Sequence, residues 1–415
     1  MTFHTDTEKK NILLITYVFP PYPGIAGRRW AKFAKYLTRN GYRVHVICAK
    51  NPFHKKSLWV QDTENNADIV THELPALYPA VLLTDPKTFF QKINYSFWNN
   101  FLPFITKGTI YDRALLWKKQ LLGKAEDIIQ KNNIQNVIVS GAPFNLNYFS
   151  TMLKNNHPSL NIISDLRDPW TWGHAYGYPS LSAQKKKYEK MKESVVMDRS
   201  DHITVPANVL KEHLASSYPL HAKKVVLLPH AFDSEEITFE KKTPSDKLRL
   251  IFYGSIYDHL EEHMREIAEI CSRNQGRVQL DIYSDSNRHE ELFRSYNLGD
   301  AVQYYPSVSS RDLFVKFKNY DYVLLMYPDY AINYLTTKIF EMLAAKTPVL
   351  YIGNKGATSD FVIENQLGVY ISPADIKAGL QNLIDNKEMT DYNFNFDTKA
   401  FSFSEITQQL IKLFK

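Results

Sequence analysis

The segment around residue 337 combines three kinds of group that bind a diphosphate. Thr336, Thr337 and Lys338 follow a polar loop and open a helical pattern. Free N–H groups at the positive end of a helix attract anions, and hydroxyl and ammonium groups add further donors. Glu341 follows one turn after Thr337, where its carboxylate could reach a ribose hydroxyl. We therefore expect a diphosphate site here, with an N-cap threonine and a surface i,i+3 ion pair as the alternative.

A loop near the N-terminus is a second candidate. Residues 20–29 read PPYPGIAGRR and follow an apolar run at 11–19. Gly24 and Gly27 let a ligand approach the backbone closely, and the helix expected after them presents free N–H groups. The pattern is not G-x-G-x-x-G, and residues 48–50 read Cys-Ala-Lys where a dehydrogenase has an acidic residue. A dinucleotide-dependent dehydrogenase is therefore disfavoured, and a stiff turn without a ligand is the alternative.

Two carboxylates near residue 167 form a third candidate. Residues 164–170 read SDLRDPW and end an apolar run, so Asp165 and Asp168 lie on either side of Arg167. Carboxylates at the end of a strand orient hydroxyls or accept a proton. The alternative is a local salt bridge with Trp170 in the core.

Alternating strand and helix patterns must position these segments. Two mostly apolar runs, at 11–19 and 42–49, have the composition of buried strands, and an amphipathic helical pattern at 29–40 lies between them. This order predicts a βαβ unit and a parallel sheet. The same alternation predicts further strands at 136–140, 161–166, 202–205 and 224–228, and further helices at 117–132, 145–156 and 183–199.

The pattern restarts after a polar connection at 229–246. Strands are predicted at 248–254, 278–284, 301–305, 321–327 and 348–353, and helices at 259–273, 290–296, 311–318 and 337–345. We therefore predict an α/β protein of two domains, 1–232 and 247–400, with a C-terminal helix at 401–415 that packs back on the first domain. Ligands of such domains bind at the carboxyl ends of the strands.

Composition narrows the class of protein. The chain has 415 residues with 50 Lys+Arg and 44 Asp+Glu, and its formal charge of +6 is too modest to indicate a nucleic-acid partner. Two cysteines cannot form a disulfide framework, and no segment reaches the roughly 18 uncharged apolar residues of a membrane span. The first residues do not resemble a signal peptide. We expect a cytoplasmic protein, with peripheral contact at the cytoplasmic membrane face left open.

In their order along the chain, these motifs resemble those of the retaining family-four glycosyltransferases. Residues 338–350, KIFEMLAAKTPVL, are similar to the second half of that family's Glu-x7-Glu motif and the helix and strand after it. Further similar segments are 227–233 (LLPHAFD), 248–256 (LRLIFYGSI) and 304–313 (YYPSVSSRDL). The resemblance implies the GT-B fold, which consists of two facing Rossmann-like domains.

The resemblance also assigns roles to residues. Glu341 would bind the ribose of a nucleotide-sugar donor, and Lys338 with the helix start at 336–337 would hold its diphosphate. Asp168 would face the sugar and the acceptor, so that Asp168 and Lys338 are the two expected catalytic residues. Asn333 stands where the family has the first glutamate, and its amide can bind a sugar hydroxyl without a charge. Four more donor-binding positions are implied: Gly27, Gly254, Ser255 and Val308.

The implied activity is the transfer of a sugar from a nucleotide sugar to a glycan or lipid-linked glycan acceptor, as in bacterial polysaccharide biosynthesis. The resemblance also implies retention of the anomeric configuration. Independence of metals and other cofactors is expected, because no Asp-x-Asp follows a strand and no His/Cys cluster has metal-ligand spacing. A nucleotide-sugar epimerase on the same scaffold and a non-catalytic nucleotide- or carbohydrate-binding protein are the alternatives.

An aromatic stretch at 89–119 contains interspersed lysines and could lie on a lipid surface. We expect instead a folded insertion that packs on the first domain. The lysines at 185–187, 190 and 192 are expected to form a solvated helix face.

Overall fold

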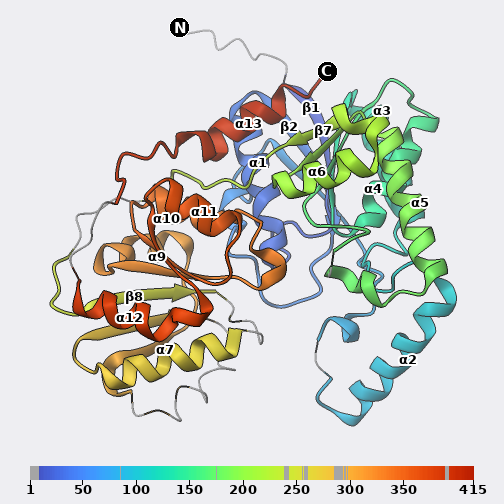
Figure 1. Ribbon diagram of the computed structural model, residues 1–415. Coiled ribbons are helices and arrows are strands. Elements are labelled where there is room, and N and C mark those ends of the chain that lie inside the picture. Colours follow the sequence, from blue (N-terminus) through green and yellow to red (C-terminus); the bar gives the residue numbers. More distant parts are fainter. Residues whose placement is uncertain are drawn as a thin grey trace, which may run out of the picture. The chain divides into compact units, whose positions relative to one another are not determined.

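The computed structural model describes residues 9–84, 86–173, 175–237, 243–254, 256, 260–284, 293, 296, 298–387 and 392–415 (Figure 1). These residues form two compact units. One contains the described part of Met1–Pro229 together with Ile406–Lys415, and the other contains the described part of His230–Glu405. The first unit ends three residues before the predicted boundary at 232, and the C-terminal residues belong to it.

The first unit is built on a seven-stranded sheet in the order β3-β2-β1-β4-β5-β6-β7, in which every pair is parallel. Its strands are β1 (Lys10–Ile15), β2 (Tyr42–Ala49), β3 (Ile69–Leu74), β4 (Asn136–Gly141), β5 (Asn161–Leu166), β6 (His202–Val205) and β7 (Val225–Leu227). The predicted parallel sheet is confirmed. β3 was not predicted, because this edge strand alternates buried and exposed residues and lacks a continuous apolar run.

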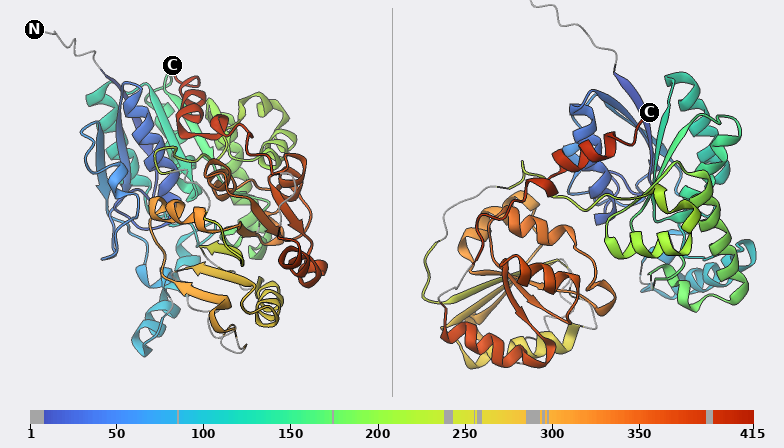
Figure 2. Two further views of the ribbon diagram at one scale, coloured as in Figure 1. Left: turned by 90° about the vertical axis from the view of Figure 1, so that its left-hand side faces the viewer. Right: turned by 45° about the horizontal axis from the view of Figure 1, so that its top comes forward.

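Helices cover the first sheet, as the views in Figure 2 show. The helices of this unit are α1 (Arg28–Arg39), α2 (Phe89–Ile105), α3 (Lys118–Asn132), α4 (Phe144–Ser150), α5 (Ala183–Arg199), α6 (Asn208–Ser217) and most of α13 (Phe403–Ile411), and of these α2 lies at the periphery instead of on the sheet. The C-terminus is tied to this unit, because the backbone N–H of Lys415 donates to Oδ1 of Asn136 at 2.9 Å. None of the described helices is long and apolar enough to span a membrane.

The second unit has a six-stranded sheet in the order β10-β9-β8-β11-β12-β13, again with parallel pairs throughout. Its strands are β8 (Leu248–Tyr253), β9 (Val278–Tyr283), β10 (Val302–Tyr305), β11 (Tyr322–Met326), β12 (Val349–Ile352) and β13 (Gly368–Ile371). Its described helices include α7 (Glu261–Arg273), α9 (Ser310–Lys316), α10 (Thr337–Ala344), α11 (Ala357–Glu364) and α12 (Ile376–Asp385). The predicted helix at 290–296 lies largely outside the described residues.

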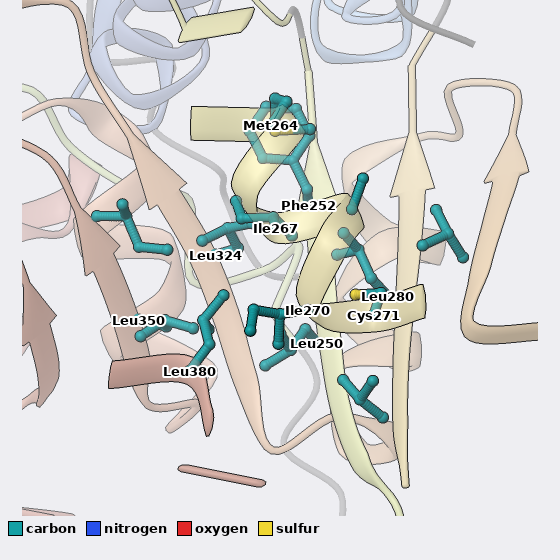
Figure 3. Close-up of a cluster of buried hydrophobic side chains, with 14 of the residues drawn as sticks. Leu250, Phe252, Met264, Ile267, Ile270, Cys271, Leu280, Leu324, Leu350 and Leu380 are labelled. Atoms are coloured by element: carbon teal, nitrogen blue, oxygen red, sulfur yellow. The ribbon is translucent and has the colours of Figure 1, made fainter. Parts of the chain in front are cut away.

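Apolar side chains of α7 pack on one face of this sheet. Figure 3 shows Phe252 of β8 near Met264 and Ile267 of α7, and all three are buried in one cluster. The same cluster includes Leu280 of β9 and Leu324 of β11. The continuous apolar runs of these strands are explained by helices on both faces of the sheet.

The strand order defines where a ligand can bind in each sheet. In the first unit the chain runs outward from β1 through β2 and β3, and then returns to continue from β4 on the other side of β1. In the second unit the same reversal separates β8 from β11. At such a switch point the loops leave the sheet in opposite directions and open a crevice at the carboxyl ends of the strands.

Two packing expectations were wrong in part. Residues 106–119 of the aromatic stretch do pack on the first unit, with Ala114 and Trp117 in its core, but the residues of α2 do not, because only Leu102 among them is buried. On α5, Lys192 is not solvated, because it is 2% exposed and its Nζ lies 2.9 Å from Oε2 of Glu189. The spacing of apolar and charged residues in the sequence did not show which apolar side chains would be buried or which lysine would form an ion pair.

Candidate active site

Lys338 connects the two loops that flank the switch point of the second sheet. It belongs to the first turn of α10, the helix that follows β11. Its Nζ donates to the carbonyl oxygen of Tyr253, the last residue of β8, at 2.7 Å. The ammonium also lies 4.9 Å from the centre of the Tyr253 ring. The predicted lysine is therefore held at the carboxyl end of β8.

Gly254 leaves the space that Lys338 occupies. A Cβ at this position would lie 2.7 Å from Nζ of Lys338, closer than non-bonded atoms approach. The φ angle of Gly254 is 99°, in a region that other residues rarely adopt. The structure thus brings Gly254 and Lys338 together, as predicted for the two sides of a phosphate site. Ser255, predicted beside them, lies outside the described residues.

The ammonium of Lys338 is partly removed from water. The side chain is half-buried, and this burial lowers its pKa from the ordinary value to about 8, while the Glu341 carboxylate opposes the shift. A desolvated ammonium favours the arrival of an anion, because the new negative charge replaces lost hydration. The site can therefore bind a diphosphate and can also stabilise charge on a departing one.

Glu341 lies one turn along α10 from Lys338. Its side chain is buried and accepts a hydrogen bond from the hydroxyl of Tyr253 at 3.3 Å. The alternative of an exposed ion pair on the helix surface is therefore wrong. A buried carboxylate beside a lysine and a tyrosine hydroxyl is a suitable acceptor for a ligand hydroxyl.

The start of α10 differs from the predicted threonine cap. Thr336 is the N-cap residue, but its side chain makes no capping hydrogen bond to the helix. Its hydroxyl contacts the hydroxyl of Tyr327, which lies just after β11. The hydroxyl of Thr336 thus contacts Tyr327 instead of a backbone N–H of its own helix. The N–H groups of the first turn, beginning at Thr337, are therefore not capped by Thr336.

Asn333 joins the loop after β11 to the loop after β12. Its Oδ1 accepts from the backbone N–H of Ala357, the first residue of α11, at 3.4 Å. A Cβ at Gly356 would lie 3.0 Å from the same oxygen. Val308 lies after β10 and packs against the apolar cluster that also contains Ile339 of α10. Both predicted residues thus lie among the loops at the carboxyl ends of the strands.

In the first unit, Gly27 is the N-cap residue of α1 and is buried. A Cβ here would lie 3.3 Å from Cγ1 of Val18 and 3.4 Å from the carbonyl oxygen of Val18. The small residue lets the start of α1 pack closely on the chain that leaves β1. Close packing is therefore one reason for a glycine at this position, whether or not a ligand binds there.

Arg167 holds three loops of the first unit together, and sequence reasoning did not assign it this role. Its guanidinium donates to the carbonyl oxygens of Ala26 at 2.9 Å, Gly141 at 3.1 Å and Ala142 at 3.1 Å. Ala26 lies in the segment after β1, Gly141 ends β4, Ala142 follows it, and Arg167 itself follows β5. Asp168, the next residue, is half-buried in the loop after β5. Arg167 therefore fixes the backbone from which the predicted catalytic carboxylate projects.

Asp165 serves the fold. It is fully buried in β5 and accepts hydrogen bonds from Nε1 of Trp30 at 3.1 Å and Oγ1 of Thr204 at 2.9 Å. Its carboxylate also forms an ion pair with Nε of Arg29 on α1 at 3.3 Å. Of the two carboxylates in this motif, only Asp168 remains a candidate for contact with substrate.

Among the described residues, no group of three or more His, Cys, Asp or Glu side chains is arranged to hold a metal ion.

Solved structures of the same fold include enzymes that handle nucleotide sugars. A glycosyltransferase from Rickettsia africae aligns with a TM-score of 0.63 at 16% identity over 98% of this chain and 97% of that one. HepE from Anabaena, in complex with UDP, aligns at 0.62 and 10% identity over 97% and 98% of the two chains. A proposed UDP-N-acetylglucosamine 2-epimerase from Listeria monocytogenes aligns at 0.58 and 11% identity over 97% and 95%.

No family model matches the sequence, and the comparison with curated proteins finds no relative. At such low identities the structural likeness shows the fold alone. The chain has the α/β architecture of the GT-B class, with two Rossmann-like domains built on parallel sheets of seven and six strands.

Proposed function

We propose that this protein is a glycosyltransferase that moves a sugar from a nucleotide-sugar donor to a glycan or lipid-linked glycan acceptor. One observation carries the proposal: a partly desolvated lysine at the start of α10, next to Gly254, at the switch point of the second sheet. Nucleotide sugars are handled by several proteins of this fold, including HepE, whose structure contains UDP. The resemblance of residues 338–350 to the family motif supports the same assignment.

In this proposal the second unit binds the donor. Lys338 and the N–H groups at the start of α10 hold the diphosphate, and Glu341 accepts a ribose hydroxyl. As the bond to the sugar breaks, negative charge grows on the leaving phosphate, and the ammonium stabilises it without a metal. Asn333 takes a sugar hydroxyl through its amide.

The first unit contributes the acceptor side of the reaction. Asp168 orients the acceptor hydroxyl and the sugar, and Gly27 is a further donor-binding residue of the proposal, where the missing side chain lets a ligand approach the backbone. In a retaining reaction the acceptor attacks from the face that the diphosphate leaves. The departing phosphate then accepts the proton of the acceptor hydroxyl, so that no covalent bond to Asp168 is needed.

Donor binding is tested by calorimetric titration with UDP, GDP, ADP and CDP. At least one of them is expected to bind, and Lys338→Met is expected to reduce its affinity by about tenfold to a hundredfold, as for a charged hydrogen bond that contributes about 1.5–3 kcal/mol. Lys346→Met is the matched control, because Lys346 follows the other end of the same helix. No binding by any of the four, or equal losses in both variants, would remove Lys338 from a donor site.

An epimerase is the second candidate, and the likeness to the Listeria protein favours it. The two activities differ in their need for an acceptor. A transferase releases free nucleoside diphosphate in proportion to an added glycan acceptor, whereas an epimerase converts one nucleotide sugar into its isomer without any acceptor. Mass spectrometry of the acceptor and chromatography of the nucleotide sugars distinguish them.

A further inference from the structure

The helix α2 of the first unit exposes most of its aromatic side chains. Of its 17 residues, only Leu102 is buried. Phe90 is 80% exposed and Phe104 is 86% exposed. Figure 1 shows α2, in cyan, at the periphery of its unit. Soluble surfaces rarely present such a group of large apolar side chains unless they bind something.

Five of the seven exposed large apolar residues of α2 form a stripe along one side of the helix. Positions three and four residues apart share one face of a helix. The aromatic stripe, as we call it, consists of Phe90, Ile93, Phe97, Phe101 and Phe104, all of them exposed. Less exposed residues, Tyr95, Trp98 and Leu102, lie on another side, toward the unit. The stripe is therefore distinct from the side by which α2 is attached.

The charge around the stripe has one sign. Residues 86–111 include Lys87, Lys92 and Lys107, and they contain no aspartate or glutamate. All three lysines are exposed. Phenylalanine, tryptophan and tyrosine side chains combined with lysines suit the boundary between the headgroups and acyl chains of anionic lipids. Two copies of the same helix would instead bring like charges together.

We propose that α2 lies in the plane of an anionic lipid surface, with the aromatic stripe entering the boundary between headgroups and acyl chains and with Lys87 and Lys107, just beyond the two ends of the helix, contacting the headgroups. At about 1.5 Å per residue, a helix of this length covers roughly 25 Å of surface. The partner is the membrane lipid itself. The proposal does not depend on the reaction proposed above, because lipid binding is measured without donor or acceptor.

Flotation of the full chain with vesicles tests the proposal. The protein is expected to float with vesicles of phosphatidylglycerol and phosphatidylcholine, much less with phosphatidylcholine alone, and less at high salt. The double variant F90S/F104S is expected to lose about tenfold or more of the vesicle affinity. Leu220→Ser is the matched control, because Leu220 is 93% exposed outside α2, and its binding is expected to stay at the wild-type level.

Three results would overturn the proposal. One is a wild-type protein that does not float with anionic vesicles. A second is equal binding by F90S/F104S and wild type. The third is a dimer in analytical ultracentrifugation that F90S/F104S converts to a monomer while vesicles bind neither protein, since the stripe would then be an interface between two copies. Circular dichroism and the unfolding transition in urea serve as the folding control, since both are expected to be the same in F90S/F104S and wild type.

Discussion

Each unit holds one cation partly or wholly away from water, at the start of a helix, and the two cations are of different kinds. In the first unit, Arg29 is paired with the buried carboxylate of Asp165. In the second unit, Lys338 bonds a backbone carbonyl and lies near Glu341. Burial lowers the pKa of both cations, and the neighbouring carboxylate opposes the shift in each case.

The two cations differ in how far a bound ligand can change their protonation. The ordinary pKa of arginine is so high that the guanidinium stays protonated in a protein, so Arg29 is a permanent part of the fold. The pKa of Lys338 falls to about 8, and its charge therefore varies near neutral pH with whatever binds beside it. A fixed charge is typical of a scaffold, and an adjustable one is typical of a binding site.

Asp165→Asn is expected to have the largest effect, because it leaves the buried Arg29 guanidinium without its counter-charge. Breaking a buried ion pair in this way costs about 3–5 kcal/mol of stability. The measurement is the unfolding free energy in urea. Asp168→Asn, three residues further on and half-buried, is the control and is expected to change stability by less than about 1 kcal/mol. Equal losses of unfolding free energy in Asp165→Asn and Asp168→Asn would show that Asp165 is no more important to the fold than Asp168.

The same Asp168→Asn variant is expected to reduce turnover while the protein stays folded. A residue that orients the acceptor acts in the transition state, so kcat is expected to fall by about tenfold to a hundredfold with little change in donor affinity. Steady-state kinetics with the identified donor and acceptor would measure it. Full activity of the variant would make Asp168 a structural residue like Asp165.

Gly254→Ala is expected to cost about 1–2 kcal/mol, because it forces a positive φ on alanine and places Cβ against Lys338. Donor affinity is expected to fall with it, since Nζ must move. Gly27→Ala is the comparison: its Cβ would meet neighbours no closer than 3.3 Å, and the loss is expected to be smaller. Thermal unfolding with and without nucleotide measures both effects. A larger loss for Gly27→Ala would reverse this ranking.

The smallest expected effect is on pH dependence. A diphosphate binds the protonated form of Lys338, so donor affinity is constant below the pKa of about 8 and falls as the pH rises above it. The slope approaches about tenfold per pH unit. Lys338→Arg is expected to remove this dependence, because the guanidinium keeps its proton. Titration calorimetry at pH values below and above the pKa of Lys338 measures donor affinity. The same slope in Lys338→Met would show that Lys338 does not cause the pH dependence.

The parallel sheets and the α10 segment could be predicted because their signals are local. Buried parallel strands appear as continuous apolar runs, and a helix start appears as a change of pattern at residues 336–338. The predicted strands of the first sheet from 136 onward are confirmed as β4 to β7 to within one or two residues. Strand order alone then implies which loops meet at the switch point.

The side-chain partners could not be predicted, because they come from distant parts of the chain. Arg29 and Asp165 are 136 residues apart, and Tyr253 and Lys338 are 85 apart. The threonine cap was wrong for another reason: the hydroxyl of Thr336 contacts that of Tyr327, nine residues earlier, and the local capping rule takes no account of such a competing partner. The aromatic residues of α2 fit the sequence pattern of a packed insertion. That pattern would be the same whether or not another surface covers the helix, so it could not show that the helix is exposed.

The three carbonyl bonds of Arg167 have a consequence for engineering the loops of the first unit. One guanidinium is shared by the segments after β1, β4 and β5, so none of them can be exchanged alone without leaving a donor or a carbonyl unsatisfied. Grafting loops from another protein of this fold into the first unit therefore requires all three segments, with the arginine, to be transplanted as a single block.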